Sequence, residues 1–395
     1  MPPQRPQHHQ RLVRFAAVVG LAAFGLFLWQ RESKRAAPPP VPATLGGMEA
    51  GAPTTPPAPA VMATGTNSLA SAAFGGLQKL AGSLKTATDA TAARQSLAEL
   101  RRALSAMPRA AAVAAVRAFL DSKEDAPTHL GFKVAGNGLL EEAPTLRTFL
   151  LDELARLDPA AAADYATGVL ASMESPDEWA VALRNLALGD ASAQGRSFLL
   201  QRTEQMLRYV PWQQNPSTGF LEAFDVAVYL GGTDLMPSLS SLVRQQDNPA
   251  VAHAAYLALD RLVISDPAAT LGAMQASPDL MQGRESTRAD YIARVDVRDP
   301  QQRQILENYL LDPHIGPAEL DVFAGVYPNA NFMVSPNLLT RAQTPDHAAL
   351  TSRDAASLAI AEQWLADPRF ATLRPELQKI TLRLQTFAQQ ANQGP

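Results

Sequence analysis

Few side chains in this sequence combine the types and the spacing that catalysis or metal binding requires. The six histidines stand at positions 8, 9, 129, 253, 314 and 347, and after position 9 no two lie three or four residues apart, as a helical metal pair would. The chain has no cysteine, which excludes disulfides, thiolate ligands and a thiol nucleophile. The nucleophile-elbow and phosphate-loop motifs are missing too. We therefore expect no metal and no cofactor, and we favour a protein that is not an enzyme.

Two short segments could still support chemistry. The Gly-Asn-Gly run at 136–138 has the start of a dinucleotide-binding fingerprint, but Glu141 stands where the third glycine belongs, so a turn is the simpler interpretation. Glu141 and Glu142, together with Asp152 and Glu153, could pair carboxylates for acid–base catalysis. The simpler interpretation is that these acids lie at helix starts and stabilise the helix dipole.

Two aromatic-rich loops are better candidates for function. The candidate residues of the first loop are Tyr209, Trp212, Asn215 and Phe220. Those of the second loop are Tyr327, Asn329, Asn331 and Phe332. Aromatic side chains mixed with amides are typical of surfaces that contact a peptide or a glycan. In the alternative interpretation, Trp212 and Phe332 fill gaps between neighbouring helices.

A basic head precedes an acidic body, and the head has the features of a membrane anchor. Residues 1–11 form a basic tail, and residues 12–30 are the expected anchor, with an uncharged apolar run from Phe15 to Trp29. A helix from Leu12 to Trp29 rises about 27 Å, against a hydrocarbon core of about 30 Å. The flanking residues suited to the membrane interface are Arg11, Arg14, Trp29, Arg31, Lys34 and Arg35. Because bulky charged residues follow the run, we expect a retained signal-anchor in the inner membrane, with the body periplasmic or otherwise extracytoplasmic. Secretion after signal cleavage is the alternative.

Residues 31–64 separate the anchor from the body. They are rich in proline and alanine, and between positions 36 and 64 Glu49 is the single charged residue. Such a segment cannot bury enough apolar surface to order itself, so we expect a disordered linker.

The body shows the periodicity of helices. Apolar residues recur at helical spacing, as at Ala93, Leu97, Leu100 and Leu104. No run alternates as a strand would, and no Asn-Gly pair is flanked by such alternation, so we expect no hairpin. The pattern predicts an all-α protein with an N-terminal helical segment at 65–122, a loop at 123–143 and a helical-repeat domain at 144–395.

Helix starts are marked by a capping residue followed by proline. These pairs are Asp158-Pro159, Ser175-Pro176, Asn248-Pro249, Asp266-Pro267, Ser277-Pro278, Asp299-Pro300, Asp312-Pro313, Thr344-Pro345 and Asp367-Pro368. Each pair predicts the first turn of a helix. The close spacing of several pairs indicates short helices joined by tight turns.

Residues 248–267 resemble a HEAT-type repeat. A proline opens a helix of small apolar residues, Leu262 lies near its end, and Asp266-Pro267 opens the next helix. The resemblance implies an irregular right-handed α-solenoid of short stacked helical hairpins. No fixed period repeats along the chain, so a compact α-helical bundle is the alternative.

Charge and organisation suggest a function class. Residues 65–395 carry 28 Lys or Arg against 36 Asp or Glu, which disfavours nucleic acid as a partner. An anchor, a linker and a helical body indicate a membrane-anchored envelope protein whose helical-repeat body is an interaction scaffold or adaptor for protein partners. The alternative is a cell-wall-acting enzyme, a glycan hydrolase or transferase, with its carboxylates on separate helices.

Overall fold

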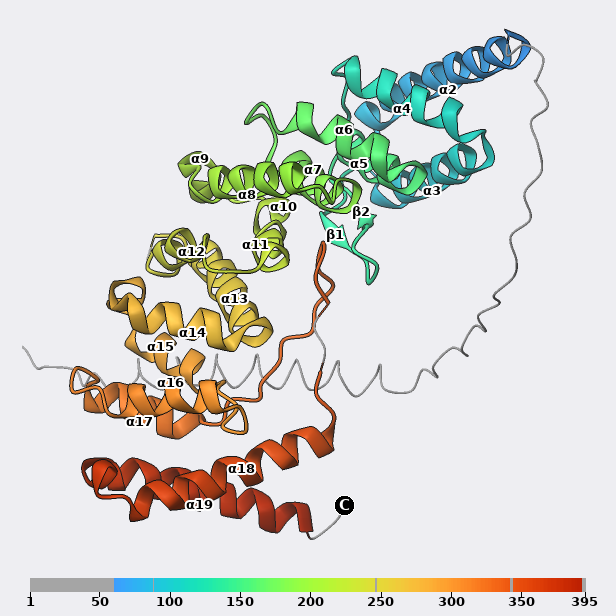
Figure 1. Ribbon diagram of the computed structural model, residues 1–395. Helices are drawn as coiled ribbons and strands as arrows, with labels where there is room; N and C mark the ends of the chain where they lie inside the picture. The colour runs from blue at the N-terminus through green and yellow to red at the C-terminus, as the bar shows by residue number, and fades with distance from the viewer. Residues whose placement is uncertain (1–59, 88, 246, 342–343, 393–395) are drawn as a thin grey trace, which may run out of the picture. The chain divides into compact units, whose positions relative to one another are not determined.

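The computed structural model describes residues 60–87, 89–245, 247–341 and 344–392. In this part the protein is all-α apart from one short hairpin, as the sequence predicts (Figure 1). The basic tail, the anchor at 12–30 and most of the linker lie outside the described residues. Among the helices that are described, none is both long and apolar enough to cross a bilayer.

The helices are mostly short and follow one another with brief connections. The first elements are α2 (Ala60–Thr86), α3 (Ala90–Ala106), α4 (Arg109–Asp121), β1 (Lys133–Val134), β2 (Leu140–Glu142), α5 (Leu146–Leu157), α6 (Pro159–Val169), α7 (Pro176–Gly189), α8 (Ala193–Leu207), α9 (Val210–Gln214), α10 (Thr218–Glu222) and α11 (Asp225–Leu230). They are followed by α12 (Met236–Val243), α13 (Pro249–Ser265), α14 (Pro267–Ala276), η1 (Pro278–Met281), α15 (Glu285–Ile292), α16 (Pro300–Leu310), α17 (Pro317–Val326), α18 (His347–Ala366), η2 (Pro368–Leu373) and α19 (Arg374–Asn392).

Most of the capping pairs begin helices as expected. The pairs at 158, 175, 248, 266, 277, 299 and 367 each place proline in the first turn of α6, α7, α13, α14, η1, α16 or η2. In six of them the capping side chain accepts a hydrogen bond from a backbone N–H of that turn. These caps satisfy donors that a helix start leaves without an intrahelical partner.

Two of the predicted helix starts are wrong. Asp312 does not open a helix, because its carboxylate accepts a hydrogen bond from the backbone N–H of His314 at 2.9 Å and closes a local turn instead. Helix α17 begins later, after Gly316. Thr344 does not cap a helix. The capping residue of α18 is Asp346, whose side chain accepts a hydrogen bond from the backbone N–H of Ala349 at 2.7 Å.

Helices pack against near neighbours in the sequence. Helix α6 contacts both α5 and α7, α13 contacts both α12 and α14, and α18 contacts α19. Contacts also join helices two places apart, such as α5 with α7 and α15 with α17. Among the described residues, buried apolar side chains form a contiguous cluster that extends from Leu77 in α2 to Leu384 in α19. Burial of this kind is the main stabilising term for short helices.

The expectation that the body contains no hairpin is wrong. Strands β1 and β2 pair antiparallel, with Val134 opposite Leu140, and the chain reverses through Asn137 and Gly138. Gly138 has a φ of +84°, which glycine adopts without strain, and the Asn137 side chain accepts from the Leu139 N–H at 3.1 Å. Because the strands are only two and three residues long, they are too short to give an alternating sequence pattern.

Candidate interaction surface

The first aromatic loop contributes mainly to the core. Trp212 is 7% exposed, and its ring packs edge-on against Trp179, Tyr209 and Phe220, with centroids 5.5, 5.0 and 6.2 Å away. Phe220 is fully buried, Tyr209 is half-buried and Asn215 is exposed. Trp212 therefore fills a gap between α7, α9 and α10, and of the four candidates Asn215 is the one that is exposed.

The second aromatic loop begins a long segment without helix, residues 327–341, which we call the crossing segment. Tyr327 is fully buried and stacks on Phe323 with ring centroids 5.0 Å apart. Asn329 is buried, and its backbone N–H donates to the Ala293 carbonyl at 2.7 Å. Asn331 is exposed. The ring of Phe332 is half-buried and lies under the Arg294 guanidinium, 5.7 Å from its centroid.

The crossing segment runs back along helices that precede it in the chain. In Figure 1 it leaves α17 and reaches the hairpin of β1 and β2 before α18 begins. Arg261 in α13 donates to the Ser335 hydroxyl at 3.0 Å. Leu338 is buried, and its carbonyl oxygen lies so close to Gly138 that a Cβ atom there would be 2.4 Å from it. The segment thus contacts α15, α13 and the hairpin in that order.

Asp225, the first residue of α11, holds the far end of the crossing segment. Its Oδ2 atom accepts hydrogen bonds from the backbone N–H groups of Leu339 at 2.7 Å and Thr340 at 2.9 Å. Its Oδ1 atom accepts from the Thr340 hydroxyl and lies 3.5 Å from Nη1 of Arg261. Asp225 is only 4% exposed, so these are charge-assisted bonds in a buried setting. We call this arrangement the Asp225 latch.

Sequence reasoning missed Asp225. The available signal was a lone acid within the apolar run 224–230, which implies a buried carboxylate in need of partners. The sequence does not indicate those partners, because Thr340 lies 115 positions further along the chain.

A cavity of about 310 Å³ lies between the crossing segment and the helices beneath it. Its apolar lining includes Val228, Leu257, Ile264, Phe332 and Met333, and its polar lining includes Asp260, Arg261 and Arg341. In the middle of the crossing segment, the side chains of Met333 and Val334 are 51% and 64% exposed. The middle of the crossing segment therefore covers the helices only loosely, whereas its two ends are buried.

The acid in this cavity is already paired. Asp260 makes two hydrogen bonds with the Arg294 guanidinium, and Oδ2 lies 2.8 Å from Nη2. Burial raises the pKa of Asp260, although the attraction of Arg294 opposes this shift. The two cationic residues of the lining also have partners: Arg261 lies 3.5 Å from Asp225, and Arg341 donates to the Asn337 and Thr340 carbonyls.

A second cavity, of about 410 Å³, lies among α4, α6 and α7 and is mainly polar. Its Glu178 forms two hydrogen bonds with Arg147, at 2.9 and 3.1 Å. Tyr165 donates to Asp121 at 3.0 Å, and burial raises the pKa of Tyr165 to about 12. Asp164 is paired with Arg117 at 2.9 Å, and Glu174, the fourth carboxylate of the lining, is exposed. Three of the four carboxylates therefore already have partners, which weakens the case for a catalytic pair in this cavity.

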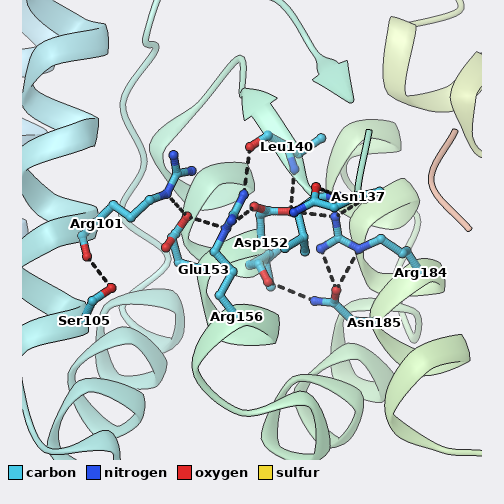
Figure 2. Close-up of polar contacts among 12 residues, drawn as sticks. Arg101, Ser105, Asn137, Leu140, Asp152, Glu153, Arg156, Arg184 and Asn185 are labelled. Atoms are coloured by element: carbon cyan, nitrogen blue, oxygen red, sulfur yellow. Dashed lines mark hydrogen bonds and ion pairs between the residues drawn. The ribbon is translucent and has the colours of Figure 1, made fainter. Parts of the chain in front are cut away.

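The acids near the hairpin form an ion-pair network rather than a catalytic pair (Figure 2). Asp152 and Arg184 are both fully buried, with Oδ1 and Nη1 2.5 Å apart. Glu153 is held by Arg101 at 2.6 Å and by Arg156 at 3.0 Å. Burial raises the pKa of Glu153, while both arginines oppose the shift.

The interpretation of these acids as helix-start residues is wrong. Asp152 and Glu153 lie within α5, which begins at Leu146, and Glu141 and Glu142 lie in β2. Their role is to fasten the hairpin. The Leu140 N–H donates to Asp152 at 2.9 Å, and Arg184 donates to the Gly138 carbonyl at 3.0 Å, as Figure 2 shows for the Leu140 bond.

Comparisons of the chain with protein-family models, with curated proteins and with solved structures find no match. The site is therefore interpreted from its own geometry. Within the described ranges, no three His, Cys, Asp or Glu side chains are placed to hold a metal ion together.

Proposed function

We propose that this protein is a membrane-anchored scaffold or adaptor whose helical body binds protein partners. In this proposal the body is an irregular right-handed α-solenoid, HEAT-like at 248–267, and the segment at 12–30 anchors it in the inner membrane with the body periplasmic. The packing of each helix against near neighbours in the sequence supports the solenoid.

The crossing segment is the single observation that carries the scaffold function. This segment lies along α11, α13 and the end of α15, and three of its backbone N–H groups donate to Asp225 and to the Ala293 carbonyl. Proteins that bind extended peptides commonly combine main-chain hydrogen bonds, which give affinity, with side-chain pockets, which give specificity. A surface that holds a segment of its own chain in this way is suited to hold a segment of another.

The competing function, a glycan-cleaving or transferring enzyme, would need two carboxylates facing one another across a cleft. Among the cavities described above, the polar one has the required residue types, but three of its four carboxylates already have partners and the fourth, Glu174, is exposed. We therefore propose a protein without catalytic activity and without a cofactor.

The scaffold function is tested with full-length protein reconstituted in nanodiscs. A photoreactive amino acid at Ile264, which lines the cavity from α13 and is 38% exposed, should crosslink protein partners in intact cells, and the purified partner should then bind the reconstituted protein directly. The same modification at exposed Leu382, in α19, serves as the control. Cleavage of peptidoglycan fragments by the reconstituted protein would overturn the scaffold assignment in favour of the enzyme.

The anchor is tested by mass spectrometry of the mature protein isolated from membranes. We expect the N-terminal segment to be retained. Recovery of a form that begins between Ala36 and Thr44 would replace the anchored protein with a secreted one. Protease protection in spheroplasts then reports on which side of the membrane the body lies.

A further inference from the structure

We propose that the crossing segment is a self-ligand, and that the groove beneath it binds an extended peptide of a partner protein when the segment is displaced. The groove comprises Asp225, the exposed face of α13 and the cavity under Phe332. This inference rests on the proposed scaffold function and assigns its binding surface. If the crossing segment proves to be a permanent brace, the protein can still be a scaffold that uses another face.

The way the segment is held supports displacement. Its ends are held by buried contacts of Asn329, Leu338 and the Thr340 backbone. In the middle, the Phe332 ring lies under Arg294 and the Ser335 hydroxyl accepts from Arg261. Between them, Met333 and Val334 are more than half exposed. A segment with few buried apolar contacts and exposed backbone opens at low free energy compared with the helices it covers.

The Asp225 latch determines which chemistry can replace the segment. Without the crossing segment, the buried Asp225 carboxylate would keep only Arg261 as a partner, at 3.5 Å. Water can solvate Asp225 while the segment is displaced, but an occupant that covers this carboxylate again without donors would bury an unsatisfied acceptor, which is costly. An occupant of the groove therefore has to bring N–H groups. In an extended chain successive N–H groups point to opposite sides, so two adjacent amides reach one carboxylate oxygen only where the chain bends, as it does at residues 338–339. The occupant is therefore an extended peptide that bends at the latch, whereas a helix presents such free amides only in its first turn.

Side chains of the segment indicate the partner's sequence. Phe332 inserts an aromatic ring beneath Arg294, and Leu338 is buried against the hairpin six residues later. Thr340 adds a hydroxyl to the latch. The expected partner is therefore an extended peptide with an aromatic residue followed, six and eight residues on, by leucine and threonine or serine.

The test uses full-length protein in detergent and a fluorescent synthetic peptide with the sequence of residues 328–341. Thr340→Pro in the protein removes one latch N–H from the segment but leaves the groove intact. Because the change also removes the Thr340 hydroxyl, two charge-assisted hydrogen bonds to Asp225 are lost, and we expect this variant to bind the peptide at least about tenfold more tightly than the wild type, measured by fluorescence anisotropy. Asn331→Ala, an exposed position in the same segment, is the matched control and should bind as the wild type does.

Two further arms show whether binding uses the latch. Asp225→Ala added to Thr340→Pro should abolish peptide binding, because it removes both acceptor oxygens of the latch. A peptide that itself carries the Thr340→Pro change should bind at least about tenfold more weakly than the unmodified peptide. The proposal is overturned if the peptide does not bind the Thr340→Pro protein, or if it binds equally well with and without Asp225.

A second measurement needs no variant and protects against a folding defect. In wild-type protein, saturating peptide should accelerate hydrogen exchange at the Leu339 and Thr340 amides at least about tenfold and leave the Leu140 amide unchanged. Unchanged exchange at Leu339 and Thr340 would show a permanent brace.

Discussion

Replacement of Arg184 by methionine should be strongly destabilising. The guanidinium is fully buried, and the change removes its bonds to Asp152 at 2.5 Å and to the Gly138 carbonyl at 3.0 Å. Loss of one partner of a buried ion pair costs about 3–5 kcal/mol, because the other charge stays buried. Asp152 would keep the Leu140 N–H and an Arg156 contact at 3.3 Å, so we expect a value near the lower end, about 3 kcal/mol.

The assay is urea unfolding of full-length protein followed by circular dichroism, together with hydrogen exchange at Leu140. The second readout is needed because helical arrays can unfold in parts. Lys133→Met, in the same hairpin, is the matched control. The Lys133–Glu141 pair is more than half exposed on both sides, so its loss should change the unfolding free energy by less than about 1 kcal/mol.

A double variant checks whether the effect comes from the uncompensated charge. Asp152→Asn combined with Arg184→Met removes both charges and should destabilise by at least about 0.5 kcal/mol less than the sum of the single changes. The reasoning is refuted if Arg184→Met is as mild as Lys133→Met, or if the two changes are additive.

Three other predictions use the same unfolding and exchange measurements. Trp212→Ala should cost about 3–5 kcal/mol because it empties a buried aromatic cluster, whereas Asn215→Ala should stay within about 0.5 kcal/mol. Burial raises the pKa of Glu153, so its contribution is fully present below the ordinary glutamate pKa and is lost as pH rises through the raised value. The stability of the wild type relative to Glu153→Gln should therefore fall from about pH 4 upward, and a constant or growing difference would contradict this. Gly138→Ala should strain the backbone, because residue 138 has a φ of +84°, and the new Cβ atom should clash with the Leu338 carbonyl oxygen. Hydrogen exchange at the amides of the crossing segment should therefore accelerate.

Local rules predict the helices well because their causes are local. Asp158, Asn248 and Asp266 each need only the backbone of the next turn to cap a helix, and the sequence displays both partners within four positions. The same reasoning fails at Thr344, where Asp346 competes two residues later and an aspartate is the better cap. Because the two competing capping residues are only two positions apart, their competition shifts the start of α18 but does not abolish the helix.

The candidate surface depends on contacts that no local rule describes. The aromatic character of the second loop drew attention to Phe332 and Asn331, and these residues do lie in the crossing segment. What holds that segment is the pairing of Asp225 with backbone N–H groups 114 and 115 residues away. Almost every residue has a backbone N–H, so the sequence shows the Asp225 carboxylate but does not indicate which N–H groups bond to it.

The buried ion-pair network at the hairpin helps to position the crossing segment, although none of the paired side chains lies in that segment. Arg184 fixes the Gly138 carbonyl, and Gly138 has no side chain that would exclude the Leu338 carbonyl. The ion pair with Asp152 therefore sets the position of the support against which Leu338 packs. Sequence reasoning considered these acids for catalysis because carboxylates near one another are chemically suggestive. Each of these acids is paired with an arginine or a lysine instead, and Asp152 together with Arg184 holds the short hairpin against which the crossing segment ends.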